Sequence, residues 1–487
     1  MYKENFVFLK KTFFNLCKGS IIAALLIVTG CRVGPNYKQP ELKVPEKFDS
    51  NLPNVETAVS RDLSKWWTNL DDPELNSLVN DVFQGNLDIK VAGDRIDQAQ
   101  AVRGVVSGSD KPQVGLQGTS MREDYSLNSL FGPFLPSQIL NDIIGSFGAR
   151  WEVDLFGKTA RSVEAAQAGI EAAVDNRNAV MVAVSASVAK QYILLRQLQK
   201  QLDVTNNNIE IQQSTINVVQ QRFNAGLVNE LVLQQAKAQL EATKSVLPKI
   251  DTALHQAIHR ISILTGREPK AIENQLITKG DIPATKPVIP IGLPSELLTR
   301  RPDVRRAERM LAAATANIGA ATADLFPRFS LTGSAGFEST EYNTFFNSDS
   351  KFWTIAYGFS WPILDAGIIR SNIKLQNAKQ REAMDTYTKI VLNALEDVEN
   401  ALVAYGNEQK RMNFLEAETS ASQRSVDLAK QRYEQGLVDF LNVLDAERQL
   451  YQAQDALTVS KSQLAIDLVM LYESLGGGWE INSAENK

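Results

Sequence analysis

The sequence predicts a mostly α-helical fold that includes membrane β-strands and is built from two copies of one unit. Three observations support this prediction. One stretch occurs twice, first at 221–237 as "QRFNAGLVNELVLQQAK" and again at 431–447 as "QRYEQGLVDFLNVLDAE". A long segment without proline precedes each copy of this stretch. Farther upstream in each half, pairs of segments alternate between apolar and polar residues, which is typical of β-strands.

The repeat extends well beyond these two stretches. Trp151 recurs as Trp361 at the same spacing of 210 residues, whereas Pro112 recurs as Pro327 at a spacing of 215. The change in spacing places a loop of different length between Pro112 and Trp151, and the whole pattern indicates a duplicated unit of about 200 residues. The predicted divisions are a signal peptide at 1–30, an extended tether at 31–72, a first repeat at 73–269, a linker at 270–294, a second repeat at 295–475 and a C-terminal tail at 476–487.

Each repeat is expected to contain an opening helix, two strands, a very long helix and a return helix. The expected ranges are 73–106, 113–122, 145–156, 158–224 and 229–265 in the first repeat, and 303–323, 328–338, 352–364, 368–434 and 439–475 in the second. At about 1.5 Å per residue, each long helix would extend about 100 Å, which exceeds a globular domain. Each return helix is about half as long, so we expect it to stack end to end on the opening helix of its repeat.

The repeated stretch is expected to form the tip of a helical hairpin. Glycine suits the left-handed position that ends a helix, and Asn229 or Asp439 can cap the helix that follows. Apolar side chains at such a tip have nothing in their own chain to cover them, which indicates contact with a partner protein. The alternative is a simple turn. The predicted tip residues are Ala225, Gly226, Leu227, Val228, Gln435, Gly436, Leu437 and Val438.

Four strands per chain are too few to close a membrane barrel, which needs about eight. An open sheet edge in lipid would leave backbone groups unpaired, so several chains are expected to share one barrel. The long helices carry polar residues at 204–208 and 212–215, where a solid bundle would have leucine. We therefore expect the helices to form a hollow, water-filled bundle.

The N-terminus has the features of an export signal. Four lysines precede an apolar run at 21–28 that is too short to span a bilayer, and Thr29, Gly30 and Cys31 follow it. Small residues directly before a cysteine resemble the lipobox of bacterial lipoproteins, in which Cys31 would be lipidated. Arg32 at the next position fits sorting to the outer membrane. The alternative is an ordinary signal peptide with a chance cysteine.

The composition excludes several classes of protein. The chain has 487 residues, a formal net charge of −5 and no basic block, which argues against nucleic acid as a partner. Of its two cysteines, Cys17 lies within the predicted signal, so the exported protein would have no internal disulfide. No other segment reaches about 18 uncharged apolar residues, so a membrane crossing by the exported protein is expected to use strands.

No catalytic arrangement is recognisable, and no cofactor or metal is expected. His255 and His259 have the spacing of zinc ligands on a helix, but Gln256 occupies the place of the glutamate found in metalloproteases. These are the only two histidines, and neither lies near a serine at a strand-to-helix turn, so a Ser-His-Asp triad is not indicated. We interpret the pair as surface histidines and the chain as a protein without enzymatic activity.

Several motifs together resemble the TolC-type outer-membrane channels of tripartite efflux systems, in the lipoprotein branch that works with resistance-nodulation-division pumps. The resemblance covers nearly the whole exported chain and rests on Cys31 with "VGPNY", "KWWTNLDDPELNSLV", "LLTRRPDVRRAERMLAAATANIGAATADLFPRFSLTG", "WPILDAG" and the second copy of the repeated stretch. It implies a homotrimer with a 12-stranded barrel, a periplasmic tunnel of long helices and a mixed equatorial region that includes the linker. It also implies that the hairpin tips bind a periplasmic adaptor protein, and that the chain is lipid-anchored in the bacterial outer membrane.

By the same resemblance, the second hairpin lines a gate. Asp445 matches a ring of pore aspartates, Leu441 a hydrophobic ring one turn earlier, and Tyr433 with Arg432 a latch near the tip. Three carboxylates in a narrow pore would repel each other and attract cations. The corresponding position in the first repeat is Gln235, so the two hairpins are not equivalent. The alternatives are a solvated carboxylate at Asp445 and, for the whole chain, a lipid-anchored coiled-coil scaffold that conducts nothing.

Overall fold

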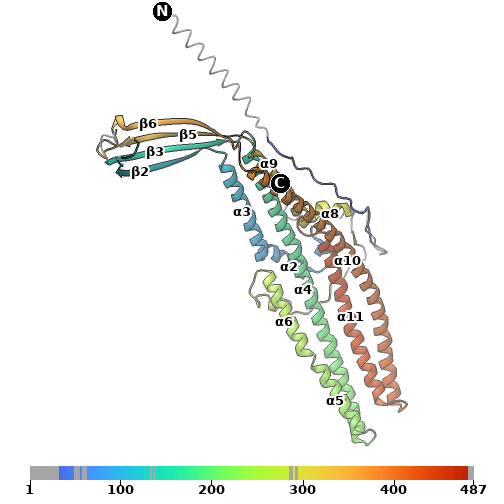
Figure 1. The fold of residues 1–487 in the computed structure, drawn as a ribbon. Coiled ribbons are helices and arrows are strands. Elements are labelled where there is room, and N and C mark those ends of the chain that lie inside the picture. The colour runs from blue at the N-terminus through green and yellow to red at the C-terminus, as the bar shows by residue number, and fades with distance from the viewer. Residues whose placement is uncertain are drawn as a thin grey trace, which may run out of the picture. The chain divides into compact units, whose positions relative to one another are not determined.

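The computed structural model describes residues 32–48, 55–56, 63–124, 126, 128–130, 134, 139–283, 289–290 and 294–480 (Figure 1). The predicted signal peptide and Cys31 lie outside the described residues. The elements before the first tip are β1 (Val55–Glu56), η1 (Trp66–Leu70), α2 (Pro73–Gly85), α3 (Leu87–Gly108), β2 (Gln113–Asp124), β3 (Ile139–Val153) and α4 (Lys158–Asn224). Those that follow are α5 (Glu230–Lys244), α6 (Leu247–Leu264), α7 (Glu273–Leu276), β4 (Ile289–Pro290), α8 (Pro294–Arg300), α9 (Pro302–Ala323), β5 (Arg328–Ser339), η3 (Ser348–Ser350), β6 (Lys351–Ser360), α10 (Ile368–Glu434) and α11 (Phe440–Ser474).

The chain divides into two compact units, and each unit draws on both sequence repeats. The first unit comprises Met1–Pro40, Ile96–Ala172 and Ala307–Tyr387, and it contains the four long strands. The second unit comprises Glu41–Arg95, Ala173–Arg306 and Thr388–Lys487, and it contains both hairpin tips. Helices α3, α4, α9 and α10 contribute residues to both units.

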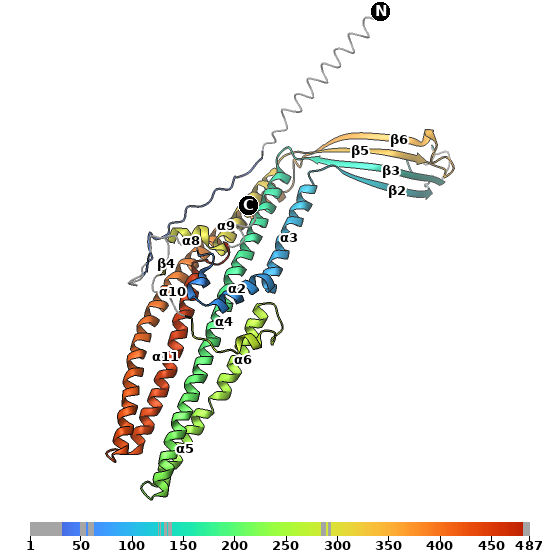
Figure 2. The same ribbon diagram turned by 180° about the vertical axis from the view of Figure 1, so that it is seen from behind.

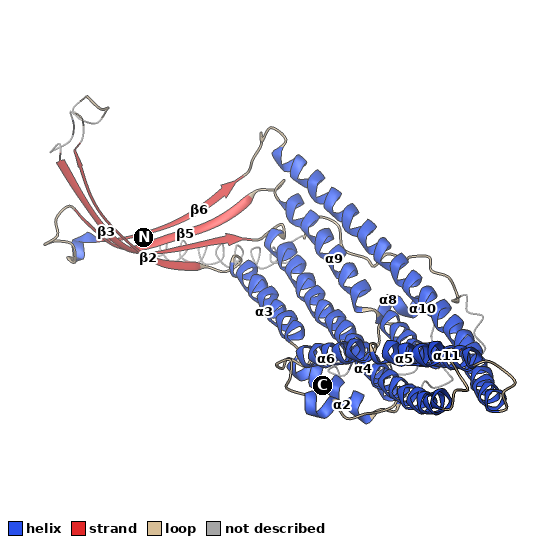
Figure 3. Ribbon diagram, turned by 90° about the horizontal axis from the view of Figure 1, so that it is seen from below, coloured by secondary structure: helices blue, strands red, loops and turns tan. Residues whose placement is uncertain are grey.

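The four predicted long strands are confirmed, and they form one antiparallel sheet in the order β2-β3-β5-β6 (Figure 3). Strand β3 begins at Ile139, six residues earlier than expected, because its pairing with β2 continues to the end of that strand. Strand β6 ends at Ser360 instead of residue 364. Pro362 follows within two residues and has no backbone N–H to donate to a neighbouring strand.

Strand register places the large apolar side chains of all four strands on one face of the sheet. Phe147 of β3 lies opposite Leu116 of β2 and Ala335 of β5, and Ala335 in turn lies opposite Trp353 of β6. Residues two positions apart along each strand share this face. The apolar face comprises Val114, Leu116, Phe147, Ala149, Trp151, Val153, Phe329, Leu331, Ala335, Phe337, Trp353, Ile355, Tyr357 and Phe359. Many of these side chains are exposed, and residues of the opposite face are mainly glycine or polar.

The two long helices have the predicted bounds and 67 residues each. A window of α4 is apolar enough, by composition, for a membrane span, but 61% of that window is buried inside the structure. Burial of this kind is typical of a helix in a protein core. In the second unit, the core includes stacked Trp66 and Tyr472, whose ring centroids lie 5.3 Å apart, and the buried side chains of Tyr192 and Ile258.

Two helices predicted as continuous are each divided. The first opening helix breaks at Asn86, whose extended backbone ends α2 and whose side-chain Oδ1 caps α3 by accepting from Asp88 N at 2.9 Å and Ile89 N at 3.1 Å. The first return helix breaks between α5 and α6, since Pro248 lacks the N–H that a continuous helix would use. Thr458 occupies the equivalent position of α11, which remains one helix.

The return helices stack on the opening helices as predicted, through equivalent contacts in both repeats. Asn86 Nδ2 donates to Leu264 O, at the end of α6, over 2.8 Å. Arg301, at the equivalent position before α9, donates through Nη1 to Ser474 O at the end of α11 over 3.0 Å. The first joint is tight, because a Cβ on Gly85 would lie 2.1 Å from Thr265 O. These bonds occupy carbonyls that the helix ends would otherwise leave unpaired.

Equivalent contacts also recur in the first unit. Trp151 Nε1 donates to Asp110 O at 3.0 Å, and Trp361 Nε1 donates to Leu325 O at 2.9 Å. These pairs combine the spacings of 210 and 215 residues found in the sequence. The N-terminal tether also packs here, because buried Arg161 donates to Val33 O at 3.1 Å and to Asn36 Oδ1 at 2.7 Å.

Replacing Asn86 with alanine should loosen the joint between α6 and α3. The variant loses a cap worth about 1–2 kcal/mol, so amide hydrogen exchange at Asp88 and Ile89 should accelerate about 5- to 30-fold. Hydrogen-exchange mass spectrometry measures this directly. Asn413→Ala is the control, since Asn413 is an exposed residue of α10. Equal exchange rates in Asn86→Ala and the unsubstituted protein would contradict a capping role for Asn86.

Candidate functional site

The two hairpin tips have the same backbone geometry. Gly226 and Gly436 both have φ of +73°, the left-handed value predicted for them. Leu227 N donates to Arg222 O at 2.9 Å, and Leu437 N donates to Arg432 O at 3.0 Å. Gly226 N also donates to Phe223 O, and Gly436 N donates to Tyr433 O. These pairs of hydrogen bonds end each helix in a Schellman motif.

Capping of the next helix differs between the tips. Asn229 Oδ1 accepts from Val232 N at 3.2 Å, as predicted. The prediction that the Asp439 side chain caps α11 is wrong, because this side chain makes no capping hydrogen bond. Asn442 N donates instead to the backbone carbonyl of Asp439 at 3.1 Å. The second tip therefore lacks one side-chain bond that holds the first.

The leucines and valines of the tips have different environments. Leu227 is 73% exposed and Leu437 is 65% exposed, as expected for residues at an uncovered tip. Val228 and Val438 are partly buried against an apolar cluster between the two hairpins, so the expectation that they are uncovered is wrong. This tip cluster comprises Ile216, Val219, Leu233, Ala236, Leu240, Tyr433, Phe440 and Val443. The exposed apolar surface near each tip therefore comes from two leucines, Leu227 with Leu231 and Leu437 with Leu441.

Tyr433 is buried between the hairpins and contacts Arg222 of the first repeat. The Arg222 guanidinium lies 4.4 Å from the centroid of the Tyr433 ring and also donates to Tyr433 O and Glu434 O at 3.3 Å. The ring packs against Phe440 at 5.3 Å. Arg432, predicted as its latch partner, is exposed and makes no side-chain hydrogen bond or ion pair within the described part of the chain. The contact of Arg222 with Tyr433 was not predicted from the sequence, although the recurrence of arginine at 222 and 432 could have indicated it.

A buried carboxylate lies one turn beyond Val443 in α11. Glu447 is only 2% exposed, and its Oε1 lies 2.8 Å from Lys430 Nζ and 3.0 Å from Thr215 Oγ1. The ion pair joins α10 to α11, and the hydrogen bond that Thr215 donates to Glu447 connects α11 to α4 of the first repeat. Glu447 therefore fixes α10 against α11 through Lys430 and accepts a hydrogen bond from the first hairpin through Thr215. Sequence analysis also missed this pair, because nothing local distinguishes Glu447 from an exposed helical glutamate.

Two of the predicted gate residues, Leu441 and Asp445, line one pocket together with Gln235, the first-repeat counterpart of Asp445. This tip pocket has a volume of about 570 Å³ and is lined by Gln235, Ala238, Gln239, Leu441, Leu444, Asp445 and Arg448. Asp445 is exposed there, accepts from Gln449 Nε2 at 2.8 Å and forms an ion pair with Arg448. The arginine offsets part of the negative charge that Asp445 contributes to the pocket.

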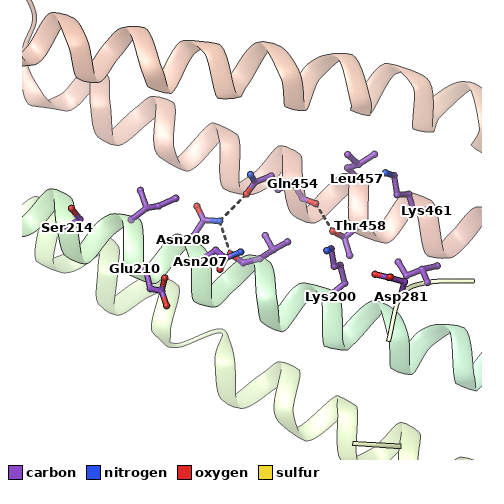
Figure 4. Close-up of a pocket in the computed structure, with 13 residues that line it drawn as sticks. Lys200, Asn207, Asn208, Glu210, Ser214, Asp281, Gln454, Leu457, Thr458 and Lys461 are labelled. Atoms are coloured by element: carbon purple, nitrogen blue, oxygen red, sulfur yellow. Dashed lines mark hydrogen bonds between the residues drawn. The ribbon is translucent and has the colours of Figure 1, made fainter. Parts of the chain in front are cut away.

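A larger pocket lies between α4, α11 and the linker segment that contains Asp281 (Figure 4). Its volume is about 880 Å³, and its labelled lining residues include the charged side chains of Lys200, Asp281 and Lys461. Asn208 of α4 lies at the pocket edge, where its Nδ2 donates to Gln454 Oε1 of α11 at 3.1 Å. The pocket is therefore an opening with a mixed polar and apolar lining beside the contact of the two hairpins.

Polar residues of α4 are divided between a helix contact and an exposed surface. Asn206, Asn207, Gln213 and Ser214 are exposed, in agreement with a wet surface. Three others, Thr205, Asn208 and Gln212, are buried, which corrects the expectation that this whole stretch faces water. The hydroxyl of Thr205 lies 3.2 Å from that of Tyr451 in α11. Part of the polar composition therefore specifies how α4 pairs with α11.

A third pocket, of about 520 Å³, lies beside Arg301 and between α10 and α11. Burial raises the pKa of the Asp303 carboxyl, but hydrogen bonds and the positive charge of Arg301 outweigh burial, so this pKa lies below its usual value. Burial raises the pKa of Asp467, and the negative charge of Glu408 adds to this effect. The acidic groups of this region are thus in different environments, and Arg301 forms ion pairs with two of them, Asp303 and Asp397.

His255 has ordinary surface contacts, whereas His259 Nε2 is buried and has no hydrogen-bond partner in the described structure. His255 Nε2 lies 3.5 Å from Glu273 Oε1, and His255 Nδ1 lies 3.6 Å from Asp251 Oδ1. Within the described ranges, no group of three or more histidine, cysteine, aspartate or glutamate side chains is arranged to hold a metal ion. The predicted lipidation site, Cys31, lies outside those ranges.

Comparison with known proteins identifies close similarity over nearly the whole chain. A family model described as "Outer membrane efflux protein" matches residues 78–267 and 293–477. The chain is 29% identical over 455 residues to nodulation protein T of Rhizobium leguminosarum bv. trifolii, covering 93% of this chain and 96% of that protein. It is 28% identical over 465 residues to the cation efflux system protein CusC of Escherichia coli O6:H1, covering 95% and 99%. The solved structure of the outer-membrane channel OprN superposes with a TM-score of 0.86 at 34% identity, covering 92% of this chain and 100% of that one.

Replacing Arg222 with alanine should loosen the packing of the two tips. The variant loses the contact with the Tyr433 ring and two bonds to carbonyls, together worth about 1–2 kcal/mol. Hydrogen exchange of the amides at 225–229 and 435–439 should therefore accelerate about 5- to 30-fold.

Tyr433→Phe is the matched control for this prediction. It keeps the ring and removes only a buried hydroxyl that has no hydrogen-bond partner in the described structure. Exchange at the tips should stay within about twofold of the unsubstituted protein, since no net hydrogen bond is lost. If Tyr433→Phe loosened the tips as much as Arg222→Ala, the hydroxyl and not the ring contact would hold them.

Proposed function

Because the chain belongs to the outer membrane efflux protein family, we propose that it is the outer-membrane exit channel of a tripartite efflux pump. It conducts small molecules passively from the periplasm to the exterior. Its partners are two further copies of itself, a periplasmic adaptor protein and an inner-membrane resistance-nodulation-division pump. Acylation of Cys31 adds an anchor in the outer-membrane lipid.

The observation that carries this proposal is the four-stranded sheet with one apolar face. Within the described residues, strands β2 and β6 each pair along one edge only. In lipid, every backbone N–H and C=O must be paired, so these edges need partner strands. Three copies joined edge to edge supply twelve strands, and a barrel with its apolar face outward satisfies the backbone and the lipid together.

The long helices support a tunnel in the periplasm. At about 1.5 Å per residue, 67 residues extend about 100 Å, far more than a compact domain requires. Polar side chains such as Asn206, Asn207 and Gln213 are exposed on α4. A ring of three copies would enclose a wide, wet lumen that discriminates little between solutes. The names of the relatives, one a nodulation protein and one a cation efflux protein, do not define one cargo for this chain.

The gate is proposed at the tips of the helices. Leu441 and Asp445 are exposed on α11, and threefold repetition would place three leucines and three carboxylates around one axis. Carboxylates held together in a narrow passage repel one another and favour cations. The contact of Arg222 with Tyr433 holds the hairpins of one chain together, and Arg432 remains available for another contact. Opening by the adaptor and pump then requires the hairpins to separate.

The tips are also the proposed binding sites for the adaptor. Each chain presents the exposed leucines Leu227 and Leu437 on turns with the same backbone geometry. Three copies would present six such turns in a ring. Leu231 and Leu441, four residues after these leucines, are also exposed, and neighbouring exposed apolar side chains suit contact with a partner.

Single-channel conductance in planar bilayers tests the proposed function. The unsubstituted protein should show a small, cation-selective conductance. Asp445→Ala should conduct severalfold more with weaker cation selectivity, because the variant lacks the carboxylates of the constriction. Asp251→Ala is the matched control, since Asp251 is an exposed acid of α6 outside the tip pocket, and its conductance should be unchanged. Absence of conductance from every variant, despite membrane insertion and trimer formation, would contradict a channel and favour a non-conducting scaffold.

A further inference from the structure

The loop between β5 and β6 is folded back over the strand sheet. It comprises residues 340–350 and lies at the opposite end of the sheet from α9 in both opposed views (Figures 1 and 2). The Tyr342 hydroxyl of this loop lies 2.7 Å from Ser120 Oγ of β2. Because β3 lies between β2 and β5, the loop has to cross β3 to make this hydrogen bond.

The loop crosses β3 on the apolar face of the sheet. Ser120 pairs with Ile143 of β3, and Ile143 is four residues from Phe147, a member of that face. Side chains four residues apart in a strand point to the same side. Ile143 is only 8% exposed, whereas Phe147 is 64% exposed. The crossing therefore lies beside Ile143, and the loop leaves Phe147 uncovered.

Three phenylalanines fix the middle of the loop to the same face. The ring centroid of Phe337 in β5 lies 6.0 Å from that of Phe345 and 5.7 Å from that of Phe346. Phe345 lies over Gly145 of β3, where a Cβ would be 2.9 Å from Cζ of the ring. A larger residue at 145 would therefore displace the ring, and glycine gives it room.

The loop nevertheless presents aromatic rings to its surroundings. Phe346 is 79% exposed and Tyr342 is 73% exposed. The polar residues Glu341, Asn343 and Asn347 of the same loop are exposed as well. Exposed aromatic rings among polar side chains are typical of the membrane–water interface, where a ring lies in lipid and its polar neighbours lie in water.

The position of the loop along the sheet agrees with the edge of the hydrocarbon layer. A tilted membrane strand spans this layer with about 9–11 residues, and about nine residues of β3 extend from Trp151 to Ile143. Trp151 is near the end of β3 that leads into α4, and Ile143 is where the loop crosses. The apolar face is therefore long enough to span the hydrocarbon layer up to the loop and no farther.

We propose that residues 340–347 bind the lipid headgroup layer of the external leaflet, from outside the barrel. The rings of Tyr342 and Phe346 enter the uppermost part of the acyl chains, and the polar residues between them remain in water. Continuity with the apolar face favours lipid over a protein as the partner, because lipid covers the adjoining strands in the proposed channel. The inference rests on the proposed function, which places this sheet in the membrane.

Spin labels on the full-length protein, in vesicles of phosphatidylcholine and phosphatidylglycerol, test this contact. Labels are attached to Phe346→Cys, to Ile355→Cys in the apolar face of β6, and to Lys270→Cys in the exposed linker. Oxygen concentrates in lipid and a neutral nickel chelate concentrates in water, so the ratio of their collision rates with a label reports its depth. We expect the ratio at 346 to be at least about threefold above that at 270 and below that at 355. The unsubstituted protein reports any label on Cys31.

Two glycine substitutions, each combined with the label at 346, test how the loop is fixed. Gly145→Ala should displace the Phe345 ring, so the label at 346 should tumble at least about twofold faster. Gly118→Ala is the matched control, because Gly118 pairs with Gly145 on the same face and a Cβ there meets nothing within 4 Å. A label at 355 in each variant reports that the sheet still inserts. Equal mobility at 346 in both inserted variants would overturn the fixation of the loop through Phe345.

The outcomes separate this inference from the proposed function. A label at 355 that meets the nickel chelate as freely as the label at 270 would overturn the membrane sheet, and the channel with it. A label at 355 in lipid together with a label at 346 in water would leave the channel in place and overturn only the lipid contact of the loop. A label at 346 shielded from both reagents would also overturn that contact, because protein would then cover the loop.

Discussion

Pairing of the backbone at the two edges of the strand sheet is the constraint on which the rest of the account depends. Strands β2 and β6 each have one edge without a partner in the described structure, and the sheet carries its aromatic side chains on one exposed face. Lipid covers such a face favourably but cannot pair the edges. In the proposed channel, other copies of the chain pair these edges, and a closed ring of copies leaves no edge open.

Equivalent contacts show how closely the two repeats follow one plan. Asn86 and Arg301 bond the carbonyls of Leu264 and Ser474, and Gly226 and Gly436 end their helices with the same geometry. Differences gather near the tips, at positions such as Gln235 and Asp445, Phe223 and Tyr433, or Lys237 and Glu447. The two tips therefore share one backbone plan and differ in the chemistry of these side chains. We interpret this divergence as the chemical basis of the gate.

Much of the fold was predictable because periodicity and repetition report local structure directly. The long helices, the four strands, the glycine turns and the stacking of return helices on opening helices were all expected from the sequence. The breaks at Asn86 and before Pro248 depended on single residues within otherwise regular patterns. The roles of Arg222 and Glu447 depended on contacts between helices far apart in sequence, which no local pattern encodes. Val228 and Val438 were misjudged for a similar reason, since they pack against a cluster to which both hairpins contribute.

The most direct test of the central claim is a cryo-electron microscopy structure of the purified protein in lipid nanodiscs. The account predicts three copies around one closed barrel of twelve strands, with β2 of each copy hydrogen-bonded to β6 of the next. Single copies in the membrane would contradict the account, as would an assembly in which the edges of β2 and β6 remain unpaired.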